Sequence, residues 1–180
     1  MSSNKAIHAL RLEQAISTLQ GADAARSFGE IHPLDEDANP AAKAAWACSV
    51  CSALKEQFYA EPAAHILRLC RCGDGKDTVD EILDCIRNAA TLTEACARFT
   101  EQTSYSYLEY VNDHELIFGY YECLCSCING ADIAVPRLWC ECSVGYAEAL
   151  FRQLFGSTVQ ATLLQTVKSG DPRCAFRITW

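Results

Sequence analysis

The chain has 180 residues, 50% of them hydrophobic, and a formal net charge of −8. This length suits one domain, with or without a helical extension, and the apolar fraction is enough to build a core without disulfide bonds. The acidic balance argues against a nucleic-acid-binding protein, because phosphate contacts need clustered Lys and Arg. No apolar run is long enough to span a bilayer and no signal-peptide core is visible, so we expect a cytoplasmic protein.

Residues 1–104 have the periodicity of helices, with apolar side chains recurring every three or four positions. Asn39 and Pro40 supply an N-cap and a proline for the first turn, which predicts the start of a long helix. Thr91 and Glu94 have the spacing of a capping box, which predicts the start of another. We therefore expect a helical N-terminal part.

From about residue 105 the periodicity changes. Segments 105–111 and 116–128 are rich in aromatic and β-branched residues and predict two strands joined by a turn. A helical pattern over 145–155 follows, and 159–180 predicts a closing hairpin. The layout predicts an α+β fold with a mainly antiparallel sheet, in which 105–180 packs with the N-terminal helices as one compact domain.

Twelve cysteines are the best clue to function. In a reducing cytosol so many thiols are not expected to form structural disulfides, which leaves buried packing residues, metal ligands or redox thiols. Cys85 and Cys96 lie on apolar helix faces and are expected to be packing residues. The densest group, with one further member near the C-terminus, is Cys123, Cys125, Cys127, Cys140, Cys142 and Cys174.

The spacing of these cysteines suits a zinc site, which needs four ligands in a tetrahedron. Alternate residues of a strand share a face, so two of Cys123, Cys125 and Cys127 could converge on one ion. Cys140 and Cys142 precede a predicted helix, whose N-terminus favours thiolates. Cys174 beside the hairpin turn would complete the set. An iron–sulfur cluster also uses four thiolates, but the usual ferredoxin spacings are absent.

A second site is also conceivable in the helical part. Cys70 and Cys72 precede a glycine-rich turn in which the backbone can bend around a ligand. Cys48, Cys51 or His65 could supply the remaining ligands. A packing role for these residues stays open.

The last third of the chain resembles a known family. Cys140 with the Gly-Tyr pair at 145–146, the Leu-Phe-Gly at 154–156 and the Gly-Asp-Pro-Arg-Cys-Ala-Phe run at 170–176 are similar to the 4-vinyl reductase domain. That family is related in fold to the TRAPP subunits of Golgi transport. The resemblance covers about residues 105–180.

The resemblance implies a zinc-braced sheet with an apolar pocket for a small molecule, as in regulators that respond to aromatic compounds. It assigns metal binding to Cys140 and Cys174. The position of a further cysteine ligand of that family falls at about Thr166. The other thiols of the dense group could replace it, and Glu122 is a candidate acidic ligand.

The leading hypothesis is therefore a cytoplasmic, zinc-braced domain that binds a small apolar or aromatic molecule and signals to a partner. Related folds often form homodimers. One rival is a metal- or cysteine-dependent enzyme with hydrolytic or redox activity. Another is a metal-handling or iron–sulfur protein.

Overall fold

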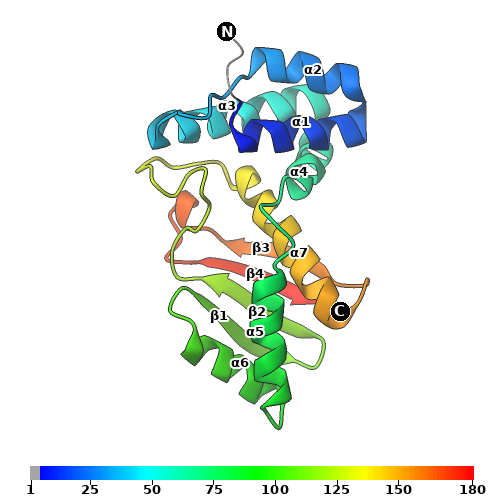
Figure 1. Ribbon diagram of the computed structural model, residues 1–180, viewed down its shortest axis with the longest axis vertical. Helices are drawn as coiled ribbons and strands as arrows, with labels where there is room; N and C mark the ends of the chain where they lie inside the picture. Colours follow the sequence, from blue (N-terminus) through cyan, green and yellow to red (C-terminus); the bar gives the residue numbers. More distant parts are fainter. Residues whose placement is uncertain (1–4) are drawn as a thin grey trace. The chain divides into compact units, whose positions relative to one another are not determined.

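The computed structural model describes residues 5–180; the side chains at positions 60 and 61 are not described. In this part of the chain a series of helices precedes the sheet (Figure 1). These helices are α1 (Ile7–Gln20), α2 (Ala22–Ile31), α3 (Pro40–Phe58), α4 (Ala60–Leu69), α5 (Lys76–Arg87) and α6 (Leu92–Gln102). The later elements are β1 (Ser106–Asn112), β2 (Glu115–Tyr120), η1 (Arg137–Cys140), α7 (Glu141–Phe155), β3 (Gln160–Gln165), η2 (Val167–Ser169) and β4 (Cys174–Thr179). None of the described helices is long and apolar enough to cross a membrane.

The described residues form two compact units. The helical unit contains the residues up to Arg71 together with Leu124–Cys142, and the sheet unit contains Cys72–Cys123 and Ser143–Trp180. We call Leu124–Cys142 the cysteine loop; it belongs with α1 to α4 and not with the sheet. The boundary expected at residue 104 stays a prediction.

Helix α3 of the helical unit begins as predicted. Asn39 Oδ1 accepts a hydrogen bond of 2.9 Å from Ala42 N, and Pro40 occupies the first turn. A cap of this kind typically stabilises a helix by about 1 kcal/mol. Further along α3, Val50 and Leu54 are fully buried, so packing also holds the helix in place.

The sheet unit contains a four-stranded sheet in the order β1-β2-β4-β3, and every neighbouring pair is antiparallel. The predicted α+β class, with a mainly antiparallel sheet and a C-terminal hairpin, is confirmed. Side chains of α5, α6 and α7 join those of all four strands in one hydrophobic core. Phe118 is buried in this core, with ring centroids 5.3 Å from Phe151 and 6.4 Å from Phe176. Burying each such ring contributes roughly 3 kcal/mol.

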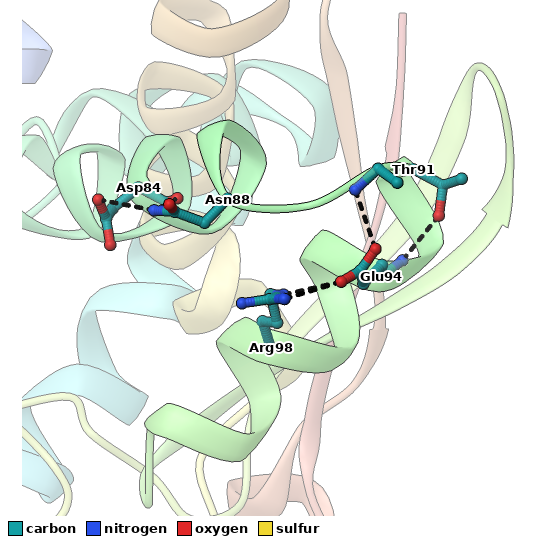
Figure 2. Close-up of polar contacts among 6 residues, drawn as sticks. Asp84, Asn88, Thr91, Glu94 and Arg98 are labelled. Carbon is teal, nitrogen blue, oxygen red and sulfur yellow. Dashed lines mark hydrogen bonds and ion pairs between the residues drawn. The ribbon is translucent and has the colours of Figure 1, made fainter.

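Helix α6 begins with the predicted capping box, which Figure 2 shows with its neighbours. Thr91 Oγ1 accepts a hydrogen bond of 3.2 Å from Glu94 N, and Glu94 Oε2 accepts one of 2.9 Å from Ala90 N. Arg98 donates to the other carboxylate oxygen at 2.8 Å. The Ala90 amide, followed by Arg98, lowers the pKa of the Glu94 carboxyl. The cap therefore satisfies two amides that the helix itself leaves unpaired.

The predicted strand over 116–128 is too long, because β2 ends at Tyr120. Beyond it the chain turns: Ile128 N and Asn129 N donate to Cys125 O at 3.0 and 2.8 Å. A backbone bent in this way has no alternating strand faces. The expectation that Cys123, Cys125 and Cys127 share one face of a strand is therefore wrong.

Candidate functional site

The six cysteines expected to form one metal site are divided between the two units. Four lie in the cysteine loop, and two lie in the sheet unit. The four are Cys125, Cys127, Cys140 and Cys142, and the two are Cys123 and Cys174.

The prediction of a zinc-braced domain is wrong. Among the described residues, no group of three or more His, Cys, Asp or Glu side chains is placed to hold a metal ion. The strand that should have aligned three thiols is absent, as shown above. The same finding removes the support for an iron–sulfur cluster, which needs several convergent thiolates.

The residues of the second predicted site belong to no metal-holding group among the described residues either. Cys70 lies in the helical unit and donates to Ile66 O at 3.3 Å. Cys72 is exposed and lies in the sheet unit. His65 is exposed on α4. The ligand set expected around the glycine-rich turn after Cys72 stays a prediction.

Within the cysteine loop, Cys125 has the most distinctive environment. Its sulfur accepts a hydrogen bond from the Cys142 thiol and from the backbone amides of Cys127 and Ile128. The Cys142 thiol has the largest effect. Together these donors outweigh the opposing effect of burial and lower the pKa of Cys125 to about 6. Hydrogen bonds to an anion favour the charged form, so Cys125 is a thiolate at neutral pH.

The local backbone explains why two amides face this sulfur. The turn closed by Ile128 N and Asn129 N on Cys125 O brings the amides that follow Cys125 towards its side chain. This is the arrangement by which an N-cap side chain accepts from the amides two and three residues later. Cys142 lies 17 residues further along the chain than Cys125, as the second residue of α7. Only the fold could bring these two sulfurs together.

Trp139 lies beside the thiolate. It is 5% exposed, and its ring packs edge-on against Trp46 at a centroid distance of 5.6 Å. The indole N–H helps to lower the pKa of Cys125. Among the described residues, however, no acceptor meets the distance and angle of a hydrogen bond to Nε1. We interpret this contact as a longer-range attraction between an N–H dipole and a negatively charged sulfur. Trp139 was missed in the sequence, although its place next to Cys140 in a Trp-Cys-Glu-Cys run is a usable signal.

Cys51, the buried thiol of α3, differs from Cys125. Burial, followed by the charge of Cys48, raises the pKa of Cys51 to about 12. The Cys48 thiol donates a hydrogen bond of 3.6 Å to the carbonyl oxygen of Ala134 in the cysteine loop. Cys51 is therefore neutral and serves packing.

In the sheet unit, Cys85 and Cys96 are core residues. Each is 2% exposed, as their apolar helix faces predict. Burial raises the pKa of Cys96 to about 11 and also raises that of Cys85. Cys174 is buried at the start of β4, and its carbonyl oxygen accepts a hydrogen bond of 3.0 Å from the Tyr107 hydroxyl. Glu122, the candidate acidic ligand, is exposed.

The motif that suggested the 4-vinyl reductase family has a local explanation. Gly170 adopts a left-handed conformation with φ 97°, and Asp171 Oδ2 accepts a hydrogen bond of 2.7 Å from Thr166 N. The Gly-Asp-Pro run thus satisfies the geometry of a hairpin connection. Such a turn can recur in unrelated sheets.

Comparison with protein families settles the membership. All 180 positions, residues 1–180, match a family of unknown function, DUF6144. The chain belongs to this family. No curated protein is detectably similar to this DUF6144 member.

Solved structures with a similar fold include H-NOX domains. The NMR structure of a Shewanella oneidensis H-NOX domain in the Fe(II)CO ligation state has 15% identity and a TM-score of 0.50, covering 97% of each chain. A crystal structure of an H-NOX protein from S. oneidensis in the Fe(II)NO ligation state gives 12% identity and a TM-score of 0.46, again over 97% of each chain. The structure of a mutant of T. tengcongensis H-NOX has 12% identity and a TM-score of 0.46, covering 97% of this chain and 96% of that one.

The first of these structures shows a shared fold and, at such low identity, nothing more. Neither the family match nor these structures points to 4-vinyl reductases, so the predicted resemblance is wrong. The function inferred from this resemblance, a zinc-braced sensor of aromatic compounds, is therefore wrong as well. The described residues also contain no group placed to hold the zinc ion.

Proposed function

We propose that this DUF6144 protein is a sensor domain for a small reactive molecule, and that the Cys125 thiolate is the group that reacts with it. The single observation behind this proposal is the set of donors around the Cys125 sulfur, from Cys142, Cys127 and Ile128. A partly exposed thiolate held by fixed donors is the usual environment of a reactive cysteine. The other cysteines with a resolved pKa shift are buried and neutral.

The nature of the molecule follows from the surroundings of the sulfur. The target of a thiolate must be an electrophile or an oxidant. The buried indole of Trp139 beside it favours an apolar or aromatic body. A small ligand is in keeping with the shared fold, since the Shewanella oneidensis H-NOX domain is described in an Fe(II)CO ligation state. We further propose a cytoplasmic location, where reductants regenerate the thiolate.

Heme is named for another of the similar structures. An iron porphyrin needs an axial His, Cys, Met or Tyr ligand. Among its described residues, the core of the sheet unit contains no histidine; it contains Cys85, Cys96 and Cys174, with partly buried tyrosines packed against it. Burial raises the pKa of Cys85 and of Cys96, which disfavours the thiolate form that binds iron. These two thiols therefore do not suit heme, and we assign no chemistry to it.

The reactivity of Cys125 should stand out most at mildly acidic pH. At pH 6 about half of a thiol with a pKa near 6 is ionised, against about 0.3% of an ordinary thiol with a pKa near 8.5. A thiolate of lower pKa is intrinsically about tenfold less nucleophilic, because the Brønsted slope is about 0.4–0.5. The net advantage of Cys125 is therefore roughly tenfold at pH 6 and only about twofold at pH 7.

The test is alkylation of the reduced, folded protein with iodoacetamide at pH 6, followed by peptide mapping. We expect Cys125 to be modified first, ahead of the more exposed Cys72. The rapid phase should vanish in Cys125→Ser and persist in the matched control Cys72→Ser. Modification of Cys125 at the rate of an ordinary thiol, with a midpoint above pH 8, would contradict the proposal.

A further inference from the structure

We propose that Cys142 is the resolving thiol of this site, and that a hydroperoxide converts Cys125 and Cys142 into an intramolecular disulfide. This inference rests on the proposed function. It adds the class of molecule sensed and the covalent product. It also assigns a role to Cys142 that is distinct from that of its neighbour Cys140.

The contact between the two sulfurs carries the inference. Cys142 donates its S–H to the Cys125 sulfur, so the two sulfur atoms lie within hydrogen-bond reach of each other. Cys127 contacts the same sulfur through its backbone amide, and Cys51 interacts electrostatically with Cys140 instead. The Cys142 thiol therefore lies next to the reactive sulfur.

The difference in exposure between Cys125 and Cys142 indicates which thiol reacts with the peroxide and which one resolves the product. Cys125 is partly exposed, which admits a peroxide to its sulfur. Cys142 is 9% exposed, which protects it from direct attack until the partner has been oxidised. Cys142 also lies in the first turn of α7, a helix of 15 residues. The N-terminal end of a helix stabilises the thiolate that Cys142 must form in order to react.

The indole N–H of Trp139 is the second observation that points to chemistry at this sulfur. A buried N–H without a full hydrogen bond is uncommon in folded proteins. Here the indole N–H lies beside the Cys125 sulfur, which carries the thiolate charge and would take up the peroxide oxygen. A sulfenic acid oxygen on Cys125 would offer Nε1 the acceptor that it lacks among the described residues of the reduced protein.

The reaction balances in two steps. The Cys125 thiolate attacks the terminal oxygen of a hydroperoxide; a sulfur–oxygen bond forms, the O–O bond breaks, and the alkoxide takes up a proton to leave as an alcohol. The Cys142 sulfur then attacks the sulfenic sulfur; the sulfur–sulfur bond forms, and the departing hydroxide leaves with the Cys142 proton as water. Two thiols and one hydroperoxide give one disulfide, one alcohol and one water. A dithiol reverses the change.

The test treats the reduced protein with one equivalent of hydrogen peroxide or cumene hydroperoxide. Remaining thiols are then blocked and the protein is mapped without reduction. We expect loss of two thiols per peroxide and a cross-linked peptide pair containing Cys125 and Cys142. In Cys142→Ser, and in Cys142→Ala as a second variant, Cys125 should stop at a sulfenic acid that dimedone traps. Cys140→Ser, two residues away and similarly buried, should still form the cross-link.

Two outcomes overturn the inference. One is dimedone trapping of Cys125 in the wild-type protein with no disulfide, and the other is an unchanged rate of disulfide formation in both Cys142 variants. Either can occur while Cys125 still reacts rapidly with iodoacetamide at pH 6, which leaves the proposed function standing. Slow alkylation of Cys125 would instead remove the proposed function itself. Circular dichroism of each variant shows whether it has folded.

Discussion

The two units of this protein contain the same kind of side chain in opposite chemical states. In the sheet unit, Cys96 lies among apolar side chains and burial raises its pKa to about 11. In the helical unit, burial also opposes the ionisation of Cys125, yet its pKa falls to about 6 because three donors converge on the sulfur. Cys51, in the helical unit but without such donors acting on its pKa, behaves like Cys96. The state of a thiol here follows from its hydrogen-bond donors more than from its depth.

The strongest test of this contrast is the pH dependence of stability, because the two kinds of thiol give slopes of opposite sign. The folded pKa of Cys125, about 6, lies below the value of about 8.5 of an unfolded thiol. Its contribution is fully present above pH 8.5 and is lost as the pH falls through 6. A shift of about 2.5 pKa units corresponds to roughly 3 kcal/mol at most.

For Cys96 the sign reverses. Its folded pKa of about 11 lies above the unfolded value, so its contribution is fully present below pH 8.5 and is lost as the pH rises towards 11. Urea unfolding from pH 6 to 10 should therefore show stability that rises and then falls. Cys125→Ser should remove the rise and Cys96→Ala should weaken the fall. An unchanged rise in Cys125→Ser would break the contrast.

A direct exchange of sulfur for oxygen should sharpen the same contrast. Cys96→Ser places a hydroxyl in the apolar core, where an unsatisfied donor costs about 2 kcal/mol. Cys125→Ser should cost less than about 1 kcal/mol at pH 6, because the amides of Cys127 and Ile128 can still donate to the serine oxygen. The measurement is the free energy of unfolding in urea. Cys96→Ala, which buries no polar atom, is the control and should cost less than Cys96→Ser.

The fold was largely predictable because its signals are local. The cap at Asn39-Pro40, the capping box at Thr91 and the turn at Gly170 each depend on a few neighbouring residues, and each is present in the structure. The thiol site was not predictable in the same way. Cys125 meets Cys142 through a tertiary contact, and no spacing encodes it.

The error over zinc has a similar physical origin. Cys123 and Cys125 are two residues apart in the chain, but the division between the units passes between them. A regular strand would have placed both side chains on one face, but the strand ends at Tyr120. Local density of cysteines therefore indicated the right region without indicating which thiols meet there.

The smallest expected effect concerns Thr91, whose hydroxyl is the oxygen counterpart of the Cys125 sulfur. Both side chains accept from amides of a following turn: Thr91 Oγ1 from Glu94 N at 3.2 Å, and Cys125 from Cys127 and Ile128. Thr91 is neutral and exposed, so Thr91→Ala should cost about 1 kcal/mol in the free energy of unfolding. This loss should be the same at pH 6 and pH 8.5, because no charge is involved, whereas the effect of Cys125→Ser should grow over that range. Thr91→Ser keeps the acceptor and should be nearly neutral. A loss at Thr91 that varied with pH as strongly as that at Cys125 would mean that the turn, and not the thiolate charge, sets the energetics of both sites.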